Sequence, residues 1–139
     1  MRIFLDTNIL MDIIFQRENE LEDALKIVAA AKDGIIECAV SVLSIVNTIY
    51  VAKKYNLTET ETKEALMKLT ECVEILDVKG ENAYDMLESS DWKDFEDGMQ
   101  HGSASDYGAD SIISRDKTGF VPSDITTCTP SEFIKTMGW

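Results

Sequence analysis

The stretch Ile3-Phe4-Leu5-Asp6-Thr7-Asn8 decides the fold class of this chain. Three consecutive apolar residues that end at an acid are typical of a short buried strand. Thr7-Asn8 then offers the hydrogen-bonding side chains that favour the start of a helix. Strands buried on both faces occur in parallel sheets, whose connections are helices. We therefore expect a strand followed directly by a helix, with Asp6 at the carboxyl end of the strand.

The same succession of strand and helix recurs along the chain. Further strands are expected at residues 35–42, 73–78, 111–114 and 125–128. Helices are expected from Thr7, over 21–31 before Gly34, over 43–54, after the capping box Thr58-x-x-Glu61, around 83–87, over 95–107 and after Thr129-Pro130-Ser131-Glu132. We predict one α/β domain over residues 1–139, a three-layer α/β/α sandwich around a central, mainly parallel five-stranded sheet.

Composition is that of a folded domain with an acidic surface. The chain has 139 residues, of which 45% are hydrophobic, enough for one substantial core. The net charge of −13 argues against a basic nucleic-acid-binding surface, although metal ions bring positive charge of their own. Residues 59–97 hold half of the 26 acidic residues, and we expect this stretch to be a solvated helical face. Any contact with nucleic acid is then expected in a small patch around bound metals.

The cysteines and the apolar stretches restrict the class of protein further. Cys38, Cys72 and Cys128 are odd in number and form no CxxC pair, so we expect neither a disulfide framework nor a zinc site. An acid at Asp6 comes too early for a signal peptide. The most apolar stretch, residues 39–52, is shorter than the roughly 20 residues that span a bilayer. We expect a cytoplasmic protein without a membrane anchor.

Two acids are expected to meet at one edge of the sheet. Asp6 and Asp116 follow the first and fourth strands, and the carboxyl ends of parallel strands share an edge. Each acid, taken alone, is also compatible with a structural role in capping a helix or a turn. For Asp6 this structural role and a functional one are equally favoured. Two or three carboxylates with water form the usual protein site for Mg²⁺.

Three further polar residues allow two interpretations each. Asn47 shares a helical stripe with Leu43, Tyr50 and Val51, so it is either a hydrogen-bonded core amide or a group that faces the acids. Asp94 and Asp97 lie at the start of the helix expected over 95–107 and share one of its faces. Capping is the favoured role for Asp94, whereas capping and metal binding are equally compatible with Asp97.

Four stretches resemble the motifs of the PIN-domain family, in order and at suitable spacing. They are Ile3-Phe4-Leu5-Asp6-Thr7-Asn8-Ile9-Leu10, Ser41-x-x-Ser44-x-x-Asn47, Asp94-Phe95-Glu96-Asp97 and Gly108-Ala109-Asp110-Ser111-Ile112-Ile113-Ser114-Arg115-Asp116. Thr129-Pro130-Ser131-Glu132-Phe133 resembles the closing helix of many members. The resemblance covers essentially the whole chain and is greatest to small bacterial or archaeal members of the VapC-toxin kind.

The resemblance implies a Mg²⁺- or Mn²⁺-dependent endoribonuclease that cleaves single-stranded RNA. By matching motifs, Asp6, Asp97 and Asp116 are the expected metal-binding acids, with Asn8, Asp94 and Ser114 in support. The second motif normally carries a glutamate, and its position here is Asn47, which we include among the expected catalytic residues. The resemblance also implies a homodimer and a small basic antitoxin protein whose arginine plugs the acidic site.

Two other functions are open at this point. Because an amide offers one ligating oxygen and no charge, Asn47 is also compatible with a pseudo-nuclease that binds RNA or a partner without cutting. A phosphoryl-transfer enzyme with Asp6 as nucleophile ranks last, since Asp6-Thr7-Asn8 lacks the second acid of a DxD motif.

The remaining candidate residues are less informative. His101 is the single histidine, so a Ser-His-Asp triad and a histidine-rich metal site are excluded, and a packing or surface role is expected. Lys93, Arg115 and Lys117 are candidates for RNA phosphate contacts, with solvated surface charge as the favoured interpretation. Trp92 and Trp139 are expected to pack rather than to stack on bases.

Overall fold

The computed structural model describes residues 1–139 and contains one sheet of five strands with seven α-helices. In chain order the elements are β1 (Arg2–Leu5), α1 (Thr7–Ile14), α2 (Leu21–Lys32), β2 (Glu37–Ser41), α3 (Val42–Ala52), a 3-10 turn (Lys53–Tyr55), α4 (Glu59–Leu69), β3 (Val73–Leu76), α5 (Gly80–Glu88), α6 (Phe95–Tyr107), β4 (Ser111–Ile113), β5 (Thr126–Cys128) and α7 (Pro130–Met137). The predicted alternation of strands and helices is confirmed.

The sheet has the strand order β3-β2-β1-β4-β5, with β1 at its centre. Every neighbouring pair is parallel, so the sheet is more uniform than the mainly parallel sheet that we predicted. The chain proceeds from β1 outward through β2 to β3, and then returns to the other side of β1 to form β4 and β5. The order therefore reverses between β1 and β4, and the crevice at such a reversal is where open α/β sheets bind ligands.

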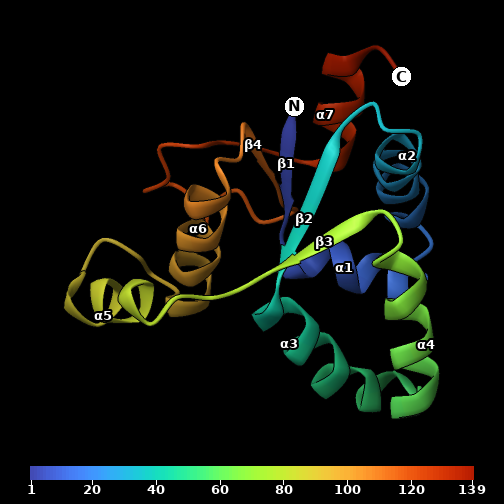
Figure 1. The fold of residues 1–139 in the computed structure, drawn as a ribbon, viewed down its shortest axis with the longest axis horizontal. Helices are drawn as coiled ribbons and strands as arrows, with labels where there is room; N and C mark the ends of the chain where they lie inside the picture. The colour runs from blue at the N-terminus through green and yellow to red at the C-terminus, as the bar shows by residue number, and fades with distance from the viewer.

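Alternate residues of β1 anchor the two outer layers. Ile3 and Leu5 are fully buried in a core with residues of α1, α2, α4 and α7, whereas Phe4 is buried in a second core with Ala104 of α6. Figure 1 shows α6, with α5 beyond it, on one side of the sheet and α1, α2 and α4 on the other. The three-layer α/β/α arrangement is therefore confirmed.

Several boundaries differ from the predicted ones. The second strand covers Glu37–Ser41 instead of 35–42, because the Ser41 side chain accepts a hydrogen bond from the Ser44 N–H and so begins α3 at Val42. The third ends at Leu76 instead of 78, since Leu76 pairs with the last residue of β2. The expected helix 43–54 ends at Ala52 and tightens into the 3-10 turn. The fourth and fifth strands are each one residue shorter than predicted.

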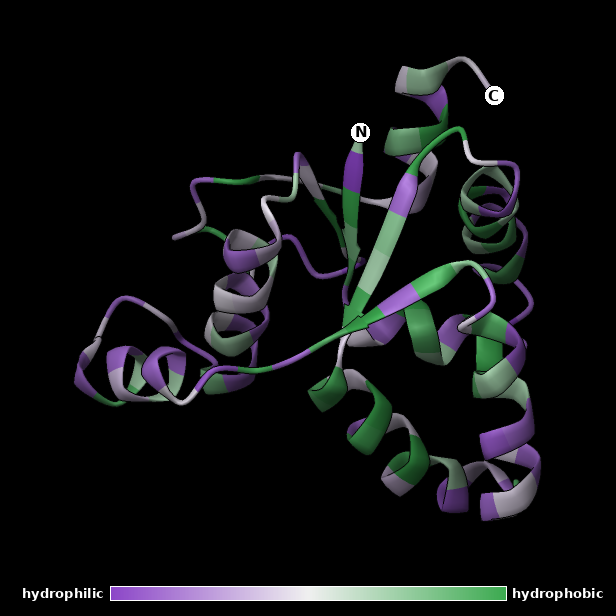
Figure 2. Ribbon diagram, viewed as in Figure 1, coloured by the Kyte–Doolittle hydropathy of each residue, from purple (hydrophilic) through white to green (hydrophobic).

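Other side chains agree with the simpler expectations. The three cysteines are free, and Cys38 is buried in the core. Trp92 packs between His101 and Phe120, and Trp139 packs edge-on against Phe133. Hydrophilic residues, coloured purple, are prominent along α4 and α5 in Figure 2, whereas most of α3 is coloured green. No helix combines the length and the apolar character that crossing a membrane requires.

Candidate functional site

A cleft of about 310 Å³ opens at the carboxyl edge of the sheet, beside the reversal between β1 and β4. Its lining comprises Asp6, Thr7, Asn8, Met11, Asn47, Tyr50, Val51, Glu96, Asp97 and Asp116. The structure thus brings together the four residues that the sequence singled out for chemistry, and Asn8 with them. They come from the junction of β1 with α1 and the start of α1, from α3, from the first turn of α6 and from the segment after β4.

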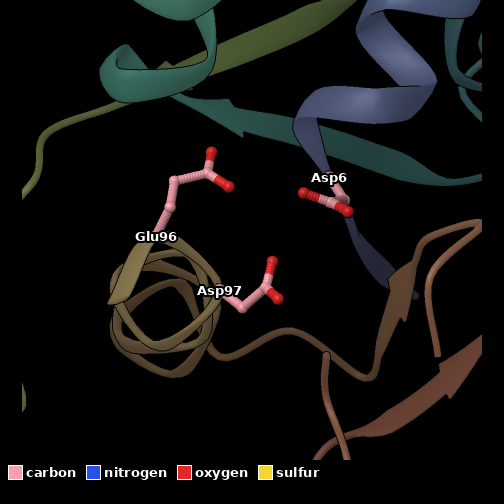
Figure 3. Close-up of side chains that lie close together, drawn as sticks. All are labelled: Asp6, Glu96 and Asp97. Atoms are coloured by element: carbon pink, nitrogen blue, oxygen red, sulfur yellow. The ribbon is translucent and has the colours of Figure 1, made fainter. Parts of the chain in front are cut away.

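Three carboxylates converge in this cleft. Asp6, Glu96 and Asp97 each place one oxygen within 4.8 Å of the others (Figure 3). Glu96 was not among the residues predicted from the sequence, although it precedes Asp97 directly in the first turn of α6. Three acids at such short range repel one another when they are ionised, so the arrangement favours either protonation or a bound cation.

Asp6 is almost completely buried, with 3% of its surface exposed. Its Oδ1 accepts a hydrogen bond from the Thr7 N–H at 2.6 Å, and its Oδ2 accepts bonds from Asn8 Nδ2 and Ser114 Oγ, each at 2.6 Å. Burial raises the pKa of Asp6 to about 6, while the hydrogen bond from Ser114 opposes that rise by favouring the ionised form. The Asp6 carboxylate therefore caps α1 and also belongs to the group of converging acids.

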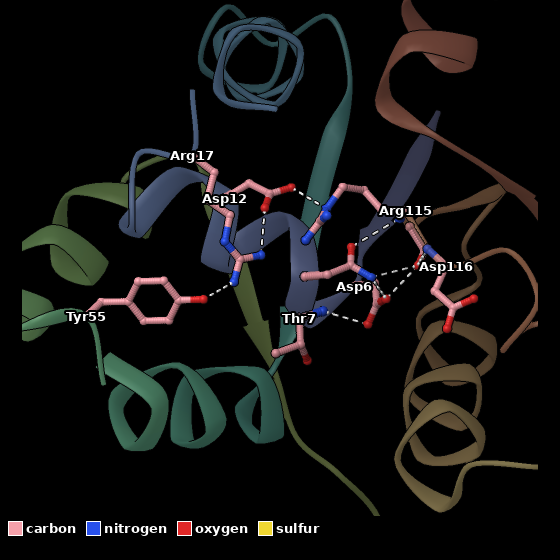
Figure 4. A network of polar contacts seen from close by, with 9 residues as sticks. Asp6, Thr7, Asp12, Arg17, Tyr55, Arg115 and Asp116 are labelled. Carbon is pink, nitrogen blue, oxygen red and sulfur yellow. Dashed lines mark hydrogen bonds and ion pairs between the residues drawn. The ribbon is translucent and has the colours of Figure 1, made fainter. Parts of the chain in front are cut away.

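Asn8 and Ser114 tie Asp6 to the segment that carries Asp116. Figure 4 shows Asp6 beside Arg115 and Asp116 of that segment. Ser114 Oγ accepts from the Asp116 N–H at 3.0 Å, and Asn8 Oδ1 accepts from the Arg115 N–H at 3.2 Å. Asn8 Nδ2 also donates to Ser114 Oγ at 3.0 Å. These bonds fix the distance between the ends of β1 and β4, which is the geometry that a supporting role requires.

Asp116 is exposed at the rim, and its carboxylate is held in a local turn. Its Oδ1 accepts hydrogen bonds from Thr118 Oγ1 at 2.6 Å and from the N–H groups of Thr118 and Gly119. The Thr118 hydroxyl contributes most to lowering the pKa of Asp116, so this acid stays ionised. A Cβ at Gly119 would collide with Asp97 Oδ2 and lie 3.5 Å from Asp116 Oδ2. The absence of a side chain at Gly119 therefore leaves the space that the two acids share.

Asp94 and Asp97 take different roles in α6. Asp94 caps the helix by accepting from the Glu96 N–H at 2.8 Å and the Asp97 N–H at 3.2 Å, as the favoured interpretation predicted. Asp97 points into the cleft. Burial, followed by the neighbouring charges of Asp6, Asp94 and Glu96, raises the pKa of Asp97 to about 7. The cap thus positions the turn on which two of the converging acids lie.

Asn47 lies at the cleft and not in the core, which corrects one of the two interpretations. The buried positions of α3 are Ser44, Thr48 and Ala52, whereas Tyr50 on the stripe of Asn47 is 70% exposed. The apolar stripe that suggested a core position therefore faces the cleft and solvent. Asn47 Nδ2 donates to Glu96 Oε1 at 3.2 Å, so the amide is satisfied by an acid of the cluster.

Gln100, which the sequence analysis did not single out, is fully buried behind the cluster. Its Nε2 lies 2.6 Å from Thr7 Oγ1, 2.8 Å from Ser44 Oγ and 2.9 Å from Glu96 Oε1, and its Oε1 accepts from Ser41 Oγ at 2.6 Å. This polar network joins β2, α3, α1 and α6 beneath the cleft. No pattern in the sequence indicated it, because the burial of a glutamine is decided by the packing of distant elements.

The chain supplies no positive charge to the cluster. No Lys or Arg lines the cleft, and Asp6, Glu96, Asp97 and Asp116 form no ion pair.

Two of the three basic side chains considered for phosphate contacts are engaged elsewhere. Arg115 Nε lies 2.8 Å from Asp12 Oδ2, and Lys117 Nζ lies 2.7 Å from Glu132. Asp12 also pairs with Arg17, which reaches Tyr55 in the network of Figure 4. These contacts agree with the interpretation of Arg115 and Lys117 as structural or solvated charges.

Comparisons with known proteins agree with the resemblance found in the sequence. The family model described as PIN domain matches residues 2–118. Ribonuclease VapC1 of Aquifex aeolicus is 29% identical, with 96% of this chain and 94% of that protein covered.

Solved structures are similar in fold. The crystal structure of VapBC2 from Rickettsia felis bound to a promoter DNA fragment matches with a TM-score of 0.67 and 17% identity, over 93% of this chain and 98% of that one. A toxin-antitoxin complex from Klebsiella pneumoniae matches with a TM-score of 0.65 and 21% identity, over 92% and 97% of the two chains. The similarity extends over nearly the whole length of each chain compared.

Proposed function

The chain belongs to the PIN domain family, and from that premise we propose that it is a divalent-metal-dependent endoribonuclease that cleaves single-stranded RNA. The observation that carries the proposal is the convergence of Asp6, Glu96 and Asp97, with Asp116 at the rim of the same cleft and no basic side chain among them. The relative from Aquifex aeolicus, which is named a ribonuclease, supports the choice of reaction.

The donor set fits Mg²⁺ or Mn²⁺. Hard divalent cations bind carboxylate oxygens, with water completing the shell, and the cleft offers carboxylates without a cysteine or a histidine. Burial first, and neighbouring carboxylates second, raise the pKa values of Asp6 and Asp97, and a bound cation would offset both penalties on the ionised forms. Asp6, Asp97 and Asp116 are the residues that we propose to hold the ion.

A bound divalent cation would lower the pKa of a water molecule and stabilise negative charge on the scissile phosphate. The side chains of the protein prepare that site. Asn8 and Ser114 hold Oδ2 of Asp6, and Thr118 holds Oδ1 of Asp116, so these carboxylates are oriented before substrate arrives. Preorganised charge of this kind avoids reorganisation during the reaction.

RNA is proposed to contact the protein at and around the cation. Without a lysine or arginine in the cleft, the phosphate has no protein cation to bind there. Tyr50 lines the same cleft and is 70% exposed, which offers an aromatic face for an unstacked base. An exposed ring beside the acids favours single-stranded over duplex substrate.

Cleavage of a mixed single-stranded RNA pool tests the proposal. Wild-type protein with Mn²⁺ or Mg²⁺ is expected to cut the pool, and both chelator and Asp6→Asn are expected to reduce the rate by two orders of magnitude or more, about 3 kcal/mol. Asp33→Asn, an exposed acid at the end of α2, is the matched control and should behave as wild type. Equal rates for wild type and Asp6→Asn would overturn the nuclease function, and an inactive wild type would favour the pseudo-nuclease that binds RNA or a partner without cutting.

We further propose that the protein acts as the toxin of a toxin–antitoxin pair, as the complexes of similar fold suggest. An apolar groove of about 500 Å³ adjoins the cleft and is lined by Val42, Val46 and Phe95 among others. It runs along α3, which is mostly green in Figure 2. We propose that an antitoxin segment occupies this groove and places a basic side chain among the acids. Expression of wild type should arrest growth of a bacterial host, whereas Asp6→Asn should not.

A further inference from the structure

We propose that Glu96, on α6, supplies the carboxylate ligand that Asn47 on α3 does not, so that the fourth acid of the site comes from a different helix. This inference rests on the metal dependence proposed above. It goes beyond the set Asp6, Asp97 and Asp116 because it assigns a ligand from the placement of a side chain. It also removes the reason to regard Asn47 as the mark of an inactive protein.

Asn47 is oriented toward a carboxylate. Its Nδ2 donates to Glu96 Oε1 at 3.2 Å, so the donor end of the amide points into the cluster. Carboxylates are the preferred partners of such a donor, whereas a cation would repel it. Asn47 therefore contributes a hydrogen bond to Glu96, where a glutamate at the same position of α3 would contribute a negative charge.

The two oxygens of Glu96 have different surroundings. Oε1 accepts from Thr7 Oγ1 at 2.9 Å, from Gln100 Nε2 at 2.9 Å and from Asn47 Nδ2 at 3.2 Å. Oε2 accepts no hydrogen bond from the chain. One oxygen is thus anchored by neutral donors from three elements, and the other is free to bind a cation. Figure 3 shows this carboxylate extending from the first turn of α6 toward Asp6.

The buried network behind Glu96 explains how the side chain keeps that orientation. Gln100 is one helical turn further along α6, is fully buried, and is held by Ser41 at its Oε1. A buried polar network stabilises the fold only when its members are satisfied, and it contributes less than apolar packing would. The network instead determines the orientation of Glu96, because Gln100 and Thr7 hold its carboxylate close to those of Asp6 and Asp97.

Calorimetric titration with Mn²⁺ alone, at pH 8 and without RNA, is the direct test. Glu96→Gln keeps the shape of the side chain and removes its charge, and we expect it to weaken Mn²⁺ binding about tenfold or more. Glu81→Gln is the matched control, since Glu81 occupies the same position in the first turn of the neighbouring helix α5 and is exposed. It should bind Mn²⁺ as wild type does. Thermal denaturation in chelator checks that each variant is folded.

The double variant Asn47→Glu with Glu96→Gln moves the charge from α6 back to α3. Because the Asn47 amide lies 3.2 Å from the Glu96 carboxylate, a glutamate at position 47 reaches the same region. We expect the double variant to recover Mn²⁺ affinity to within a few-fold of wild type. A general loss of folding in Glu96→Gln would not be reversed by this second change, so recovery separates a ligand from a structural role.

The outcomes separate this inference from the proposed function. If Glu96→Gln and Glu81→Gln both bind Mn²⁺ as wild type does while Asp97→Asn binds weakly, Glu96 is not a ligand and the metal-dependent nuclease stands. If the double variant stays as weak as Glu96→Gln, the exchange between α3 and α6 is overturned. If wild type binds neither Mn²⁺ nor Mg²⁺ and does not cleave RNA, the proposed function fails and this inference with it.

Discussion

Ser114 is the residue whose hydroxyl joins the two central strands at the candidate site. It donates to Asp6 Oδ2 at 2.6 Å and accepts from the Asp116 N–H at 3.0 Å. Ser114→Ala removes these two bonds and the one accepted from Asn8 Nδ2, all in a buried place, and is expected to cost about 1–2 kcal/mol of unfolding free energy. It also removes the bond that lowers the pKa of Asp6, so Mn²⁺ affinity near pH 7 should fall.

Ser103→Ala is the control for that change. Ser103 is equally buried, but its hydroxyl donates only to the Met99 carbonyl within α6. We expect a similar or smaller loss of stability in chemical denaturation and an unchanged Mn²⁺ titration. A Ser114→Ala protein with wild-type metal affinity would show that Asp6 does not depend on this hydroxyl.

At the residue scale, sequence reasoning located acids that follow strands and missed acids placed by packing. Asp6 and Asp116 could be predicted to meet because strand ends share an edge in any parallel sheet. Glu96 could not, since consecutive helical residues point in different directions and Asp97 already accounted for the motif. For Asn47 the sequence left a core amide and a group facing the acids equally open, and the residue lies at the cleft. Metal-binding roles for all of these residues remain predictions.

At the scale of elements, the N-terminus of α6 carries both Glu96 and Asp97, so its cap should affect metal binding. Asp94→Ala removes the bonds to the two N–H groups of that turn and is expected to cost about 1 kcal/mol. The frayed turn should bind Mn²⁺ several-fold more weakly. Denaturant unfolding and titration with Mn²⁺ measure the two effects.

Thr129→Ala separates the loss of helix stability from the loss of metal binding. Thr129 caps α7 through a capping box with Glu132, and it is not among the residues that line the cleft. The loss of stability should be comparable, and Mn²⁺ affinity should not change. Equal metal affinities for both cap variants would show that the order of the first turn of α6 does not matter for the site.

The turn after β4 depends on Gly119, which approaches Asp97 more closely than a Cβ allows. Gly119→Ala must displace the Asp97 carboxylate or the turn that holds Asp116, and we expect Mn²⁺ affinity to fall about tenfold. Gly80→Ala is the control, because nothing lies within 4 Å of a Cβ there. Isothermal titration of the two variants decides whether this close approach matters, and equal affinities would contradict it.

At the scale of the whole molecule, alternation of strands and helices was sufficient to predict the layers, but not the order of the strands. Nothing in the sequence of β4 says that it pairs with β1 on the side opposite β2. That pairing creates the reversal at which the acids gather. Long-range pairing of this kind depends on how all the crossovers pack together, which local patterns do not encode.

The converging acids make the stability of the whole metal-free protein depend on pH in an unusual direction. Folding raises the pKa of Asp6 to about 6 and that of Asp97 to about 7, from ordinary values of 3.8. Between about pH 4 and 7 the folded state therefore holds more protons at these groups than the unfolded state does. Their contribution to the free energy of unfolding then falls as the pH rises through this range and is least favourable near pH 8.

Asp97→Asn isolates this effect, because other titrating groups are shared with wild type. In chelator, the variant should come closest to wild type in stability near pH 4 and below, where Asp97 is protonated in the folded state and largely protonated in the unfolded state. It should exceed wild type by a growing margin up to pH 8, since it lacks the buried and repelled charge. Mn²⁺ at about one hundred times its Kd should raise the unfolding free energy of wild type at pH 8 by roughly 2.7 kcal/mol and change that of Asp97→Asn far less. Thermal melts across this pH range, with and without Mn²⁺, measure both differences. A metal-free wild type that is more stable than Asp97→Asn at pH 8 would contradict the repulsion from which the cation site is argued, because the acids would then be stabilised by the chain itself.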